Sequence, residues 1–341
     1  MKDLLIAIDQ GGSKTEVIVF SPDGRLLLRT NDKDIRLESV GSFEDNRWFF
    51  IEQTILNALK HLGGVSADIC GVIAAMCGAD WPDDYQHMHE VIASRLHIPT
   101  DRVYVINDCV AALRAEQPII GDKPDSAIIY AGTMFNCSLE SKLGSLYTYG
   151  RLINGEDHGA FAIGKQVWNA ILDSYNGFQE PTLMTNIFLE RQNAASVLEV
   201  CEKFTNNSLA FRPVSFAPIL FQAVEKEDMV AKKIFCIFAD RWTRYVIKGA
   251  PLVGFTSKTD ISLFLSGGVF KNCPQLWMKE IKQCLSHYTY RIDCSLAKLE
   301  PIAGAIILLL EKYYHKQLDR QVLINLKQSD VFKTLLINST I

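Results

Sequence analysis

The sequence predicts a two-domain α/β protein, and three observations carry that prediction. The chain has 341 residues, about twice the length of a typical single domain. Strand-like apolar runs alternate with segments of helical spacing along most of the chain. Finally, three strand-like runs followed by helix, strand and helix occur in that order twice. We expect two such cycles to face each other across a cleft, where ligand sites are commonly built.

The first cycle opens with an antiparallel meander. Its strand-like runs are expected at 4–8, 16–20 and 25–29, joined by a Gly-rich turn and by a Ser-Pro-Asp-Gly turn. The remaining elements of this cycle alternate between helix and strand, beginning and ending with a helix. They are expected at 49–62, 69–75, 85–96, 103–106 and 109–115.

The second cycle repeats the pattern around a helical middle. Strands are expected at 126–130, 136–140, 145–149 and 261–265, and helices at 160–172, 194–204, 214–224, 229–247, 275–285 and 302–314. The expected domains are 1–115 and 116–320, the second carrying a helical insertion at about 182–252. The extension 321–341 is rich in apolar residues, which predicts packing on the body of the protein or on a second subunit.

Composition bounds the classes of function. A net charge of −4 argues against a general nucleic-acid binder. The longest apolar run, Ile302 to Leu310, is too short to cross a bilayer, so no membrane partner is expected. The N-terminal segment, with Asp3 and Asp9, is read as a strand and not as a signal peptide. Nine cysteines without a CxxC pair favour reduced thiols and a cytoplasmic location.

The turn Asp9-Gln10-Gly11-Gly12-Ser13-Lys14-Thr15 is the first candidate for chemistry. Glycines let backbone approach a polyphosphate, hydroxyls and a lysine can contact phosphate oxygens, and Asp9 can hold Mg²⁺. The alternative is an ordinary Gly-rich hairpin turn.

The pair Asn107-Asp108 ends a strand where a helix begins. Asp108 is either a general base facing the cleft or a helix N-cap.

Two further Gly-containing turns follow strands in the second cycle. They are 130–136, which contains Gly132 and Thr133, and 265–269, which contains Gly267 and Gly268. The second turn suits an adenosine lying against bare backbone. Each turn alone is a weak signal, and the order and spacing of the whole series carry the prediction.

That series resembles the N-acetylglucosamine kinase-like branch of the BadF/BadG/BcrA/BcrD ATPase family, within the sugar kinase, Hsp70 and actin superfamily. The resemblance covers about residues 4 to 314 and rests on blocks in the family's order. These are the hairpin IDQGGSKTEVIVFSPDGRLL and the segments 75–80, 107–112, 130–136, 155–164, 266–269 and 301–305. It implies duplicated ribonuclease H-like (actin-like ATPase) domains with an interdomain cleft that holds Mg-ATP.

The resemblance also implies a role for each matching position. Asp9 would hold hydrated Mg²⁺, and Asp108 would be the base that takes a proton from a sugar hydroxyl. The implied ATP and phosphate contacts are Gly11, Gly12, Ser13, Lys14, Gly132, Thr133, Gly267 and Gly268. The implied sugar contacts are Asn107, Asp108, Asn136, Glu156 and Asp157. The expected activity is ATP-dependent phosphorylation of a sugar or amino sugar, and the expected assembly is a homodimer.

The chain departs from the family pattern at two of these blocks. Met134 and Phe135 replace a Gly and a Ser of the second phosphate turn, which predicts a loop of another shape with fewer donors. Glu156-Asp157 inverts an acidic pair, and His158 replaces a Gly. These changes keep a second function open, an actin-like fold that serves as a nucleotide- or sugar-responsive binding module with weak or lost catalysis.

Overall fold

The computed structural model describes residues 3–11, 15–31, 43–153, 158–315, 318 and 320–336. The chain forms two compact units. Unit 1 comprises Met1–Ile128, Ser138–Arg151 and Ala297–Ile341, and unit 2 comprises Ile129–Cys137 and Leu152–Leu296. The C-terminal segment thus belongs with the N-terminal part of the chain. The domain bounds 1–115, 116–320 and 321–341 stay predictions.

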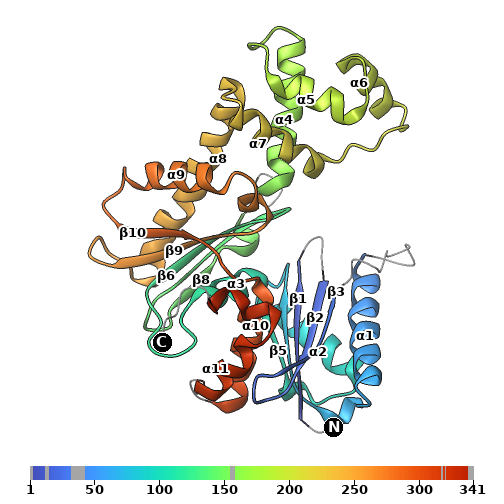
Figure 1. The fold of residues 1–341 in the computed structure, drawn as a ribbon, viewed down its shortest axis with the longest axis vertical. Coiled ribbons are helices and arrows are strands. Elements are labelled where there is room, and N and C mark those ends of the chain that lie inside the picture. The colour runs from blue at the N-terminus through green and yellow to red at the C-terminus, as the bar shows by residue number, and fades with distance from the viewer. Residues whose placement is uncertain are drawn as a thin grey trace. The chain divides into compact units, whose positions relative to one another are not determined.

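Unit 1 is built on a five-stranded sheet in the order β3-β2-β1-β4-β5 (Figure 1). The strands are β1 (Leu4–Gln10), β2 (Thr15–Phe20), β3 (Leu26–Asn31), β4 (Ile69–Met76) and β5 (Val103–Asn107). The meander β1-β2-β3 is antiparallel, as its turns predict, whereas β4 and β5 run parallel to β1. Crossover helices make this parallel pairing possible.

Helices cover both faces of this sheet. The helices are α1 (Phe43–His61), α2 (Pro82–Leu96), α3 (Asp108–Glu116) and α10 (Pro301–Tyr314). Strand β1 shows why both faces are buried: Leu4, Ile6 and Ile8 pack in the core formed with α1 and α2. Leu5 and Ala7 pack in the opposite core with α3 and α10. Because successive side chains of a strand point to opposite faces, alternate residues of β1 contribute to two separate cores.

The segment after α10 packs on unit 1. Val322 and Leu326 of α11 (Arg320–Lys327) and Phe332 beyond it are buried in the same core as α10. Asn325 Nδ2 donates to the backbone oxygen of Asp23, 2.6 Å away. Of the two placements that the apolar tail predicts, these contacts show packing on the body of the protein for residues 320–332.

The second sheet repeats the topology of the first. Its strands are β6 (Ser126–Ala131), β7 (Phe135–Glu140), β8 (Leu146–Thr148), β9 (Asp260–Ser266) and β10 (Arg291–Leu296), in the order β10-β9-β6-β7-β8. Counted within its own cycle, each sheet has the order 3-2-1-4-5. The predicted α/β fold with a duplicated unit is confirmed.

The middle of the chain is helical, as its apolar spacing predicts. The helices of this cycle are α4 (Gly159–Tyr175), α5 (Leu183–Gln192), α6 (Val197–Thr205), α7 (Ala217–Glu225), α8 (Met229–Gly249) and α9 (Pro274–Leu285). The expected helix 194–204 begins too early: Asn193 is left-handed at the end of α5, and the Ser196 hydroxyl accepts from Glu199 N to cap α6. None of the helices in the described ranges has the length and apolarity needed to span a membrane.

Candidate functional site

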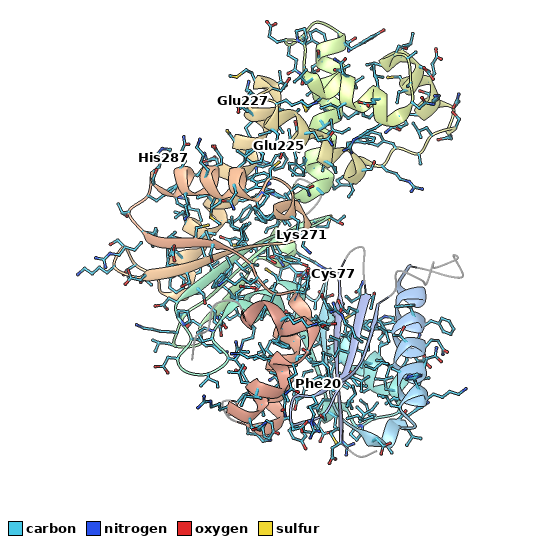
Figure 2. All side chains as sticks on the ribbon, in the orientation of Figure 1. Phe20, Cys77, Glu225, Glu227, Lys271 and His287 are labelled. Carbon is cyan, nitrogen blue, oxygen red and sulfur yellow. The ribbon has the colours of Figure 1, made fainter. Side chains whose placement is uncertain are left out.

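Three strand ends meet at one edge of the unit 1 sheet. Gln10 of β1 pairs with Met76 of β4, and Met76 pairs with Asn107 of β5. Just beyond these ends, the amide of Cys77 donates to the carbonyl of Gln10 at 2.8 Å, and Figure 2 labels Cys77 at this edge. Because the carboxyl ends of parallel strands share an edge, Asp9 and the Asn107-Asp108 pair belong to one locus.

Asp9 lies near the end of β1 and is 9 % exposed. Gln10 is buried and its Nε2 donates to the carbonyl of Gly11 at 2.8 Å. Among the described residues, no group of three acidic, His or Cys side chains could hold a metal. A single carboxylate nevertheless fits Mg²⁺, which keeps several waters and takes phosphate oxygens as ligands. Gly12, Ser13 and Lys14 lie outside the described residues.

Glu16 is a buried carboxylate that the sequence analysis missed. It faces Asp9 across the β1–β2 pair, and its Oε1 lies 2.5 Å from Arg29 Nε. A buried charge is tolerated when it is paired, so Arg29 makes Glu16 compatible with the core. The sequence of β2 gives no hint of this pairing, since Arg29 comes from β3.

Asn107 caps helix α3. Its Oδ1 accepts from the amide of Cys109 at 2.9 Å, the usual N-cap arrangement. Its Nδ2 donates to the carbonyl of Ala79 at 3.1 Å and to Asp80 Oδ1 at 2.9 Å. With 1 % exposure, this side chain is engaged on both its oxygen and its nitrogen. The predicted contact between Asn107 and sugar stays a prediction.

Asp108 is the first residue of α3 and not its cap, so the capping role belongs to its neighbour. Its side chain is 8 % exposed, and Oδ1 accepts from the amide of Cys109 at 2.9 Å. Burial raises the pKa of Asp108 to about 7, with a further contribution from the charge of Asp80, while the Cys109 hydrogen bond opposes the shift. A carboxyl with a pKa near neutrality can both accept and release a proton under physiological conditions.

Asp80, in the turn between β4 and α2, was assigned no role from sequence. Its Oδ1 accepts from Asn107, and its Oδ2 lies 3.7 Å from Arg151 Nε. Arg151 Nη2 also lies 3.1 Å from Asp84 Oδ1. Burial raises the pKa of Asp80, and Arg151 lowers it. The Gly78-Ala79-Asp80 block is the signal that could have pointed to this residue.

In unit 2, the turn between β6 and β7 is tied to the start of α4. The carbonyls of Gly132 and Thr133 accept from the amides of Ala160 and Phe161, at 2.9 and 3.1 Å. Nothing lies within 4 Å of a Cβ built on Gly132, so one side of the turn is open. Met134 is 42 % exposed, and its φ is not positive. It therefore occupies this turn without left-handed strain.

Phe135 points into an aromatic cluster formed by Phe135, His158, Trp242 and Tyr245. Its ring stacks on Trp242 with centroids 5.5 Å apart, and it lies 5.3 Å from His158 and 5.2 Å from Tyr245. Tyr245 Oη and His158 Nε2 are 3.0 Å apart. Phe135 thus supplies packing where the resembling family has a hydroxyl. The next residue, Asn136, accepts from the amide of Cys137 through its Oδ1 at 2.8 Å.

The paired glycines after β9 differ from each other. Gly267 has φ +100° and lies against the backbone of Ala131, whereas nothing lies within 4 Å of a Cβ on Gly268. Gly267 therefore closes the packing between β9 and β6, and Gly268 faces open space that could accept a ligand. Glu156 and Asp157 lie outside the described residues.

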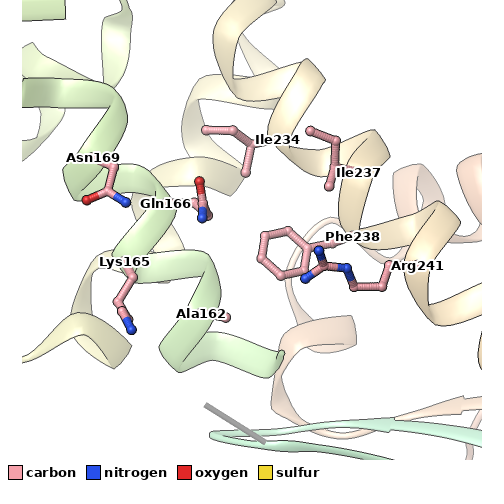
Figure 3. Close-up of a pocket in the computed structure, with 8 residues that line it drawn as sticks. All are labelled: Ala162, Lys165, Gln166, Asn169, Ile234, Ile237, Phe238 and Arg241. Atoms are coloured by element: carbon pink, nitrogen blue, oxygen red, sulfur yellow. The ribbon is translucent and has the colours of Figure 1, made fainter. Parts of the chain in front are cut away.

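A separate pocket of approximately 540 Å³ lies between α4 and α8 of unit 2 (Figure 3). Lys165 and Asn169 come from α4, and Phe238 and Arg241 from α8. None of the residues predicted from sequence lines it. Its lining combines two basic side chains and two amide side chains with apolar ones.

Comparison with known proteins gives structural likeness alone. No protein-family model matches the chain, and no curated protein matches it by sequence. The candidate N-acetylglucosamine kinase of Porphyromonas gingivalis superposes with a TM-score of 0.60 at 17 % identity, over 91 % of this chain and 99 % of that one. A ROK family glucokinase from Streptomyces griseus, solved with glucose and AMPPNP, gives 0.56 at 16 % identity, over 89 % and 97 %.

A ROK family transcriptional regulator, a homologue of the E. coli MLC protein, superposes similarly. Its TM-score is 0.59 at 12 % identity, over 96 % of this chain and 82 % of that one. These structures share the α/β fold of the chain, with its two mixed five-stranded sheets. The fold is that of the sugar kinases, and within it proteins named as kinases and as regulators both occur.

Proposed function

We propose that this chain is an ATP-dependent sugar kinase. The observation that carries the proposal is Asp108: a buried carboxyl at the first position of α3, with its pKa raised to about 7, at the sheet edge shared with Asp9. The fold shared with a glucokinase that binds glucose and AMPPNP supports it. The order of the sequence blocks supports it independently.

In the proposed reaction, Asp108 accepts the proton of an acceptor hydroxyl. The hydroxyl oxygen forms a bond to the γ-phosphorus of ATP, the bond from that phosphorus to the β,γ-bridging oxygen breaks, and ADP leaves. Phosphoryl transfer needs mainly positioning and neutralisation of charge. Mg²⁺ bound with Asp9 would supply part of that neutralisation, and Gly11, Gly12, Ser13 and Lys14 would supply donors to the phosphates.

The nucleotide would also use unit 2. Gly132 and Gly268 both present backbone with free space where a side chain would stand, which suits close approach of a phosphate or an adenosine. Thr133 and Gly267 belong to the same two turns. We propose these four residues as nucleotide contacts.

For the acceptor, we propose a hexose or an amino sugar of the N-acetylglucosamine type. The likeness to the Porphyromonas gingivalis protein supports this class. Asn107, Asn136, Glu156 and Asp157 are the proposed contacts besides Asp108. Carboxylates and amides suit sugar hydroxyls because they form short, directional hydrogen bonds with them.

A panel of hexoses and amino sugars tests this function. ADP release from Mg-ATP is measured with each sugar, for the wild-type chain and for Asp108→Asn. The proposal expects at least one sugar to stimulate ADP release and the variant to lose that stimulation. If no sugar stimulates release, or if the variant responds like the parent, the kinase assignment is wrong.

A second candidate function is a nucleotide- or sugar-responsive binding module. Phe135 favours it, because a packed aromatic ring stands where the family's second phosphate turn offers a hydroxyl. The regulator with the same fold also supports it. This candidate predicts that a sugar raises the melting temperature of the chain without any release of ADP.

A further inference from the structure

Asp80 connects the cap of α3 to a cation from a distant part of the sequence. One carboxylate oxygen accepts from Asn107 Nδ2 at 2.9 Å, and the other lies 3.7 Å from Arg151 Nε. The Asp80 side chain is 11 % exposed. The backbone at residue 150 also approaches closely, since a Cβ on Gly150 would stand 2.5 Å from Asp80 Oδ1. Asp80 is therefore held on both sides.

Asn107 transmits this restraint to the helix start. Its amide nitrogen is held by Ala79 O and Asp80 Oδ1, so the orientation of its amide plane is determined, and its Oδ1 is directed at the amide of Cys109. The same Cys109 amide donates to Asp108 Oδ1. A rotation of the Asn107 side chain would therefore break its hydrogen bond with the amide of Cys109, the same amide that donates to Asp108.

We propose that Asp80 is a positioning residue for Asp108: through Asn107 it fixes the first turn of α3. The negative charge of Asp80 also acts on the Asp108 carboxyl. This inference rests on the proposed kinase function, in which Asp108 is the residue that touches substrate. Asp80 acts through Asn107. A misplacement of the base by about 1 Å can cost on the order of 100-fold in rate, so such a restraint matters for catalysis.

The charged and titratable groups facing Asp80 come from three elements. Arg151 approaches from the segment after β8, Asp84 and Tyr85 from α2, and Asp108 from α3. Arg151 favours the ionised form of Asp80, and burial and Asp84 oppose it. The negative charge of Asp80 in turn helps to raise the pKa of Asp108. Asp80 therefore acts on Asp108 in two ways, through its hydrogen bond with Asn107 and through its charge.

Two substitutions separate them. Asp80→Asn keeps an oxygen that can accept from Asn107 and removes the charge, whereas Asp80→Leu removes both. The matched control is Asp83→Asn. Asp83 is an exposed carboxylate in the first turn of α2, three residues after Asp80 in the sequence. Each full-length variant is assayed for sugar-dependent ADP release as a function of pH, with kcat and KM determined for sugar and ATP.

We expect Asp80→Leu to lower kcat about tenfold or more and to leave the KM for ATP within about twofold. Asp80→Asn is expected to retain most of kcat and to move the acidic limb of the pH profile to lower pH. Asp83→Asn should match the wild-type chain. If Asp108→Asn abolishes activity while both Asp80 variants behave like the wild-type chain, the inference fails and the kinase function stands.

A readout without catalysis completes the test. The carboxyl of Asp108 is titrated by carbon-13 NMR in the wild-type chain, Asp80→Asn and Asp83→Asn. A lower pKa of Asp108 in Asp80→Asn alone supports the inference even if no sugar is phosphorylated. An unchanged pKa overturns the electrostatic part of it, whatever the outcome of the kinase assay.

Discussion

The backbone of Gly267 lies against the carbonyl of Ala131: a Cβ on residue 267 would stand 2.3 Å from that oxygen. Gly267 also has φ +100°, a backbone conformation that residues with a side chain rarely adopt. Gly267→Ala is therefore expected to lower the free energy of unfolding by about 2 kcal/mol or more. Denaturant unfolding measures this loss. A stability equal to that of the wild-type chain would contradict the packing of β9 against β6.

Gly268→Ala is the matched variant next door. Nothing lies within 4 Å of its Cβ position, so stability should change by less than about 0.5 kcal/mol. Because we propose that this open space receives the nucleotide, the added methyl group should raise the KM for ATP. Equal KM values in the variant and the parent would remove Gly268 from the proposed nucleotide contacts.

Phe135 and Met134 should lose stability to different degrees when each is replaced by the residue that the family pattern has at that position. Phe135→Ser removes a buried ring from the cluster with Trp242 and leaves a hydroxyl there, so a loss of about 3 kcal/mol is expected. Met134→Gly changes an exposed side chain and should cost about 1 kcal/mol or less. Thermal and denaturant unfolding compare the two. Equal losses would mean that the ring does not stabilise unit 2.

The ion pair between Arg114 and Glu311 joins α3 to α10. Arg114 is 2 % exposed, and its Nη2 lies 2.7 Å from Glu311 Oε1. Glu311→Gln leaves a buried guanidinium without its carboxylate, which should cost about 3 kcal/mol of stability. Asp23→Asn, in the exposed pair with Arg25, should cost well under 1 kcal/mol. A small effect of Glu311→Gln would show that water reaches Arg114.

Much of this arrangement could be predicted from sequence because it depends on local signals. Apolar spacing predicted the two cycles, and the Asn107-Asp108 pair was placed correctly where β5 gives way to α3. Strand β10 was missed: it is an edge strand of alternating polarity, and Cys294 is its one buried residue. An edge strand has one neighbour, so its sequence carries a weaker pattern.

The missed parts of the site depend on contacts between distant segments. Asp80 gains its role only because β4 and β5 are adjacent and because Arg151 returns to the turn after β4. The sequence predicted for Met134 and Phe135 only a loop of another shape with fewer donors. It did not predict the packing of Phe135, since its partner Trp242 lies on a helix more than 100 residues later. Local patterns carry no information about such pairs.

Asp108 should make stability and activity respond to pH in opposite directions. Its pKa is about 7 in the folded protein and near 3.8 when unfolded, so the folded state binds more protons between these values. The contribution of Asp108 to stability therefore falls as pH rises from about 4 to 7. Relative to the wild-type chain, Asp108→Asn should gain stability between pH 5 and pH 8. A difference that is the same at both pH values would contradict the shifted pKa.

The central claim is that Asp108 accepts the proton of a sugar hydroxyl during phosphoryl transfer. Phosphorus-31 NMR of the products formed from Mg-ATP and a responsive sugar tests it most directly, with Asp83→Asn as the surface control. We predict that the wild-type chain and Asp83→Asn form a sugar phosphate, more rapidly as pH rises through about 7, and that Asp108→Asn forms none at a measurable rate. Sugar phosphate formed by Asp108→Asn at the wild-type rate would contradict the claim.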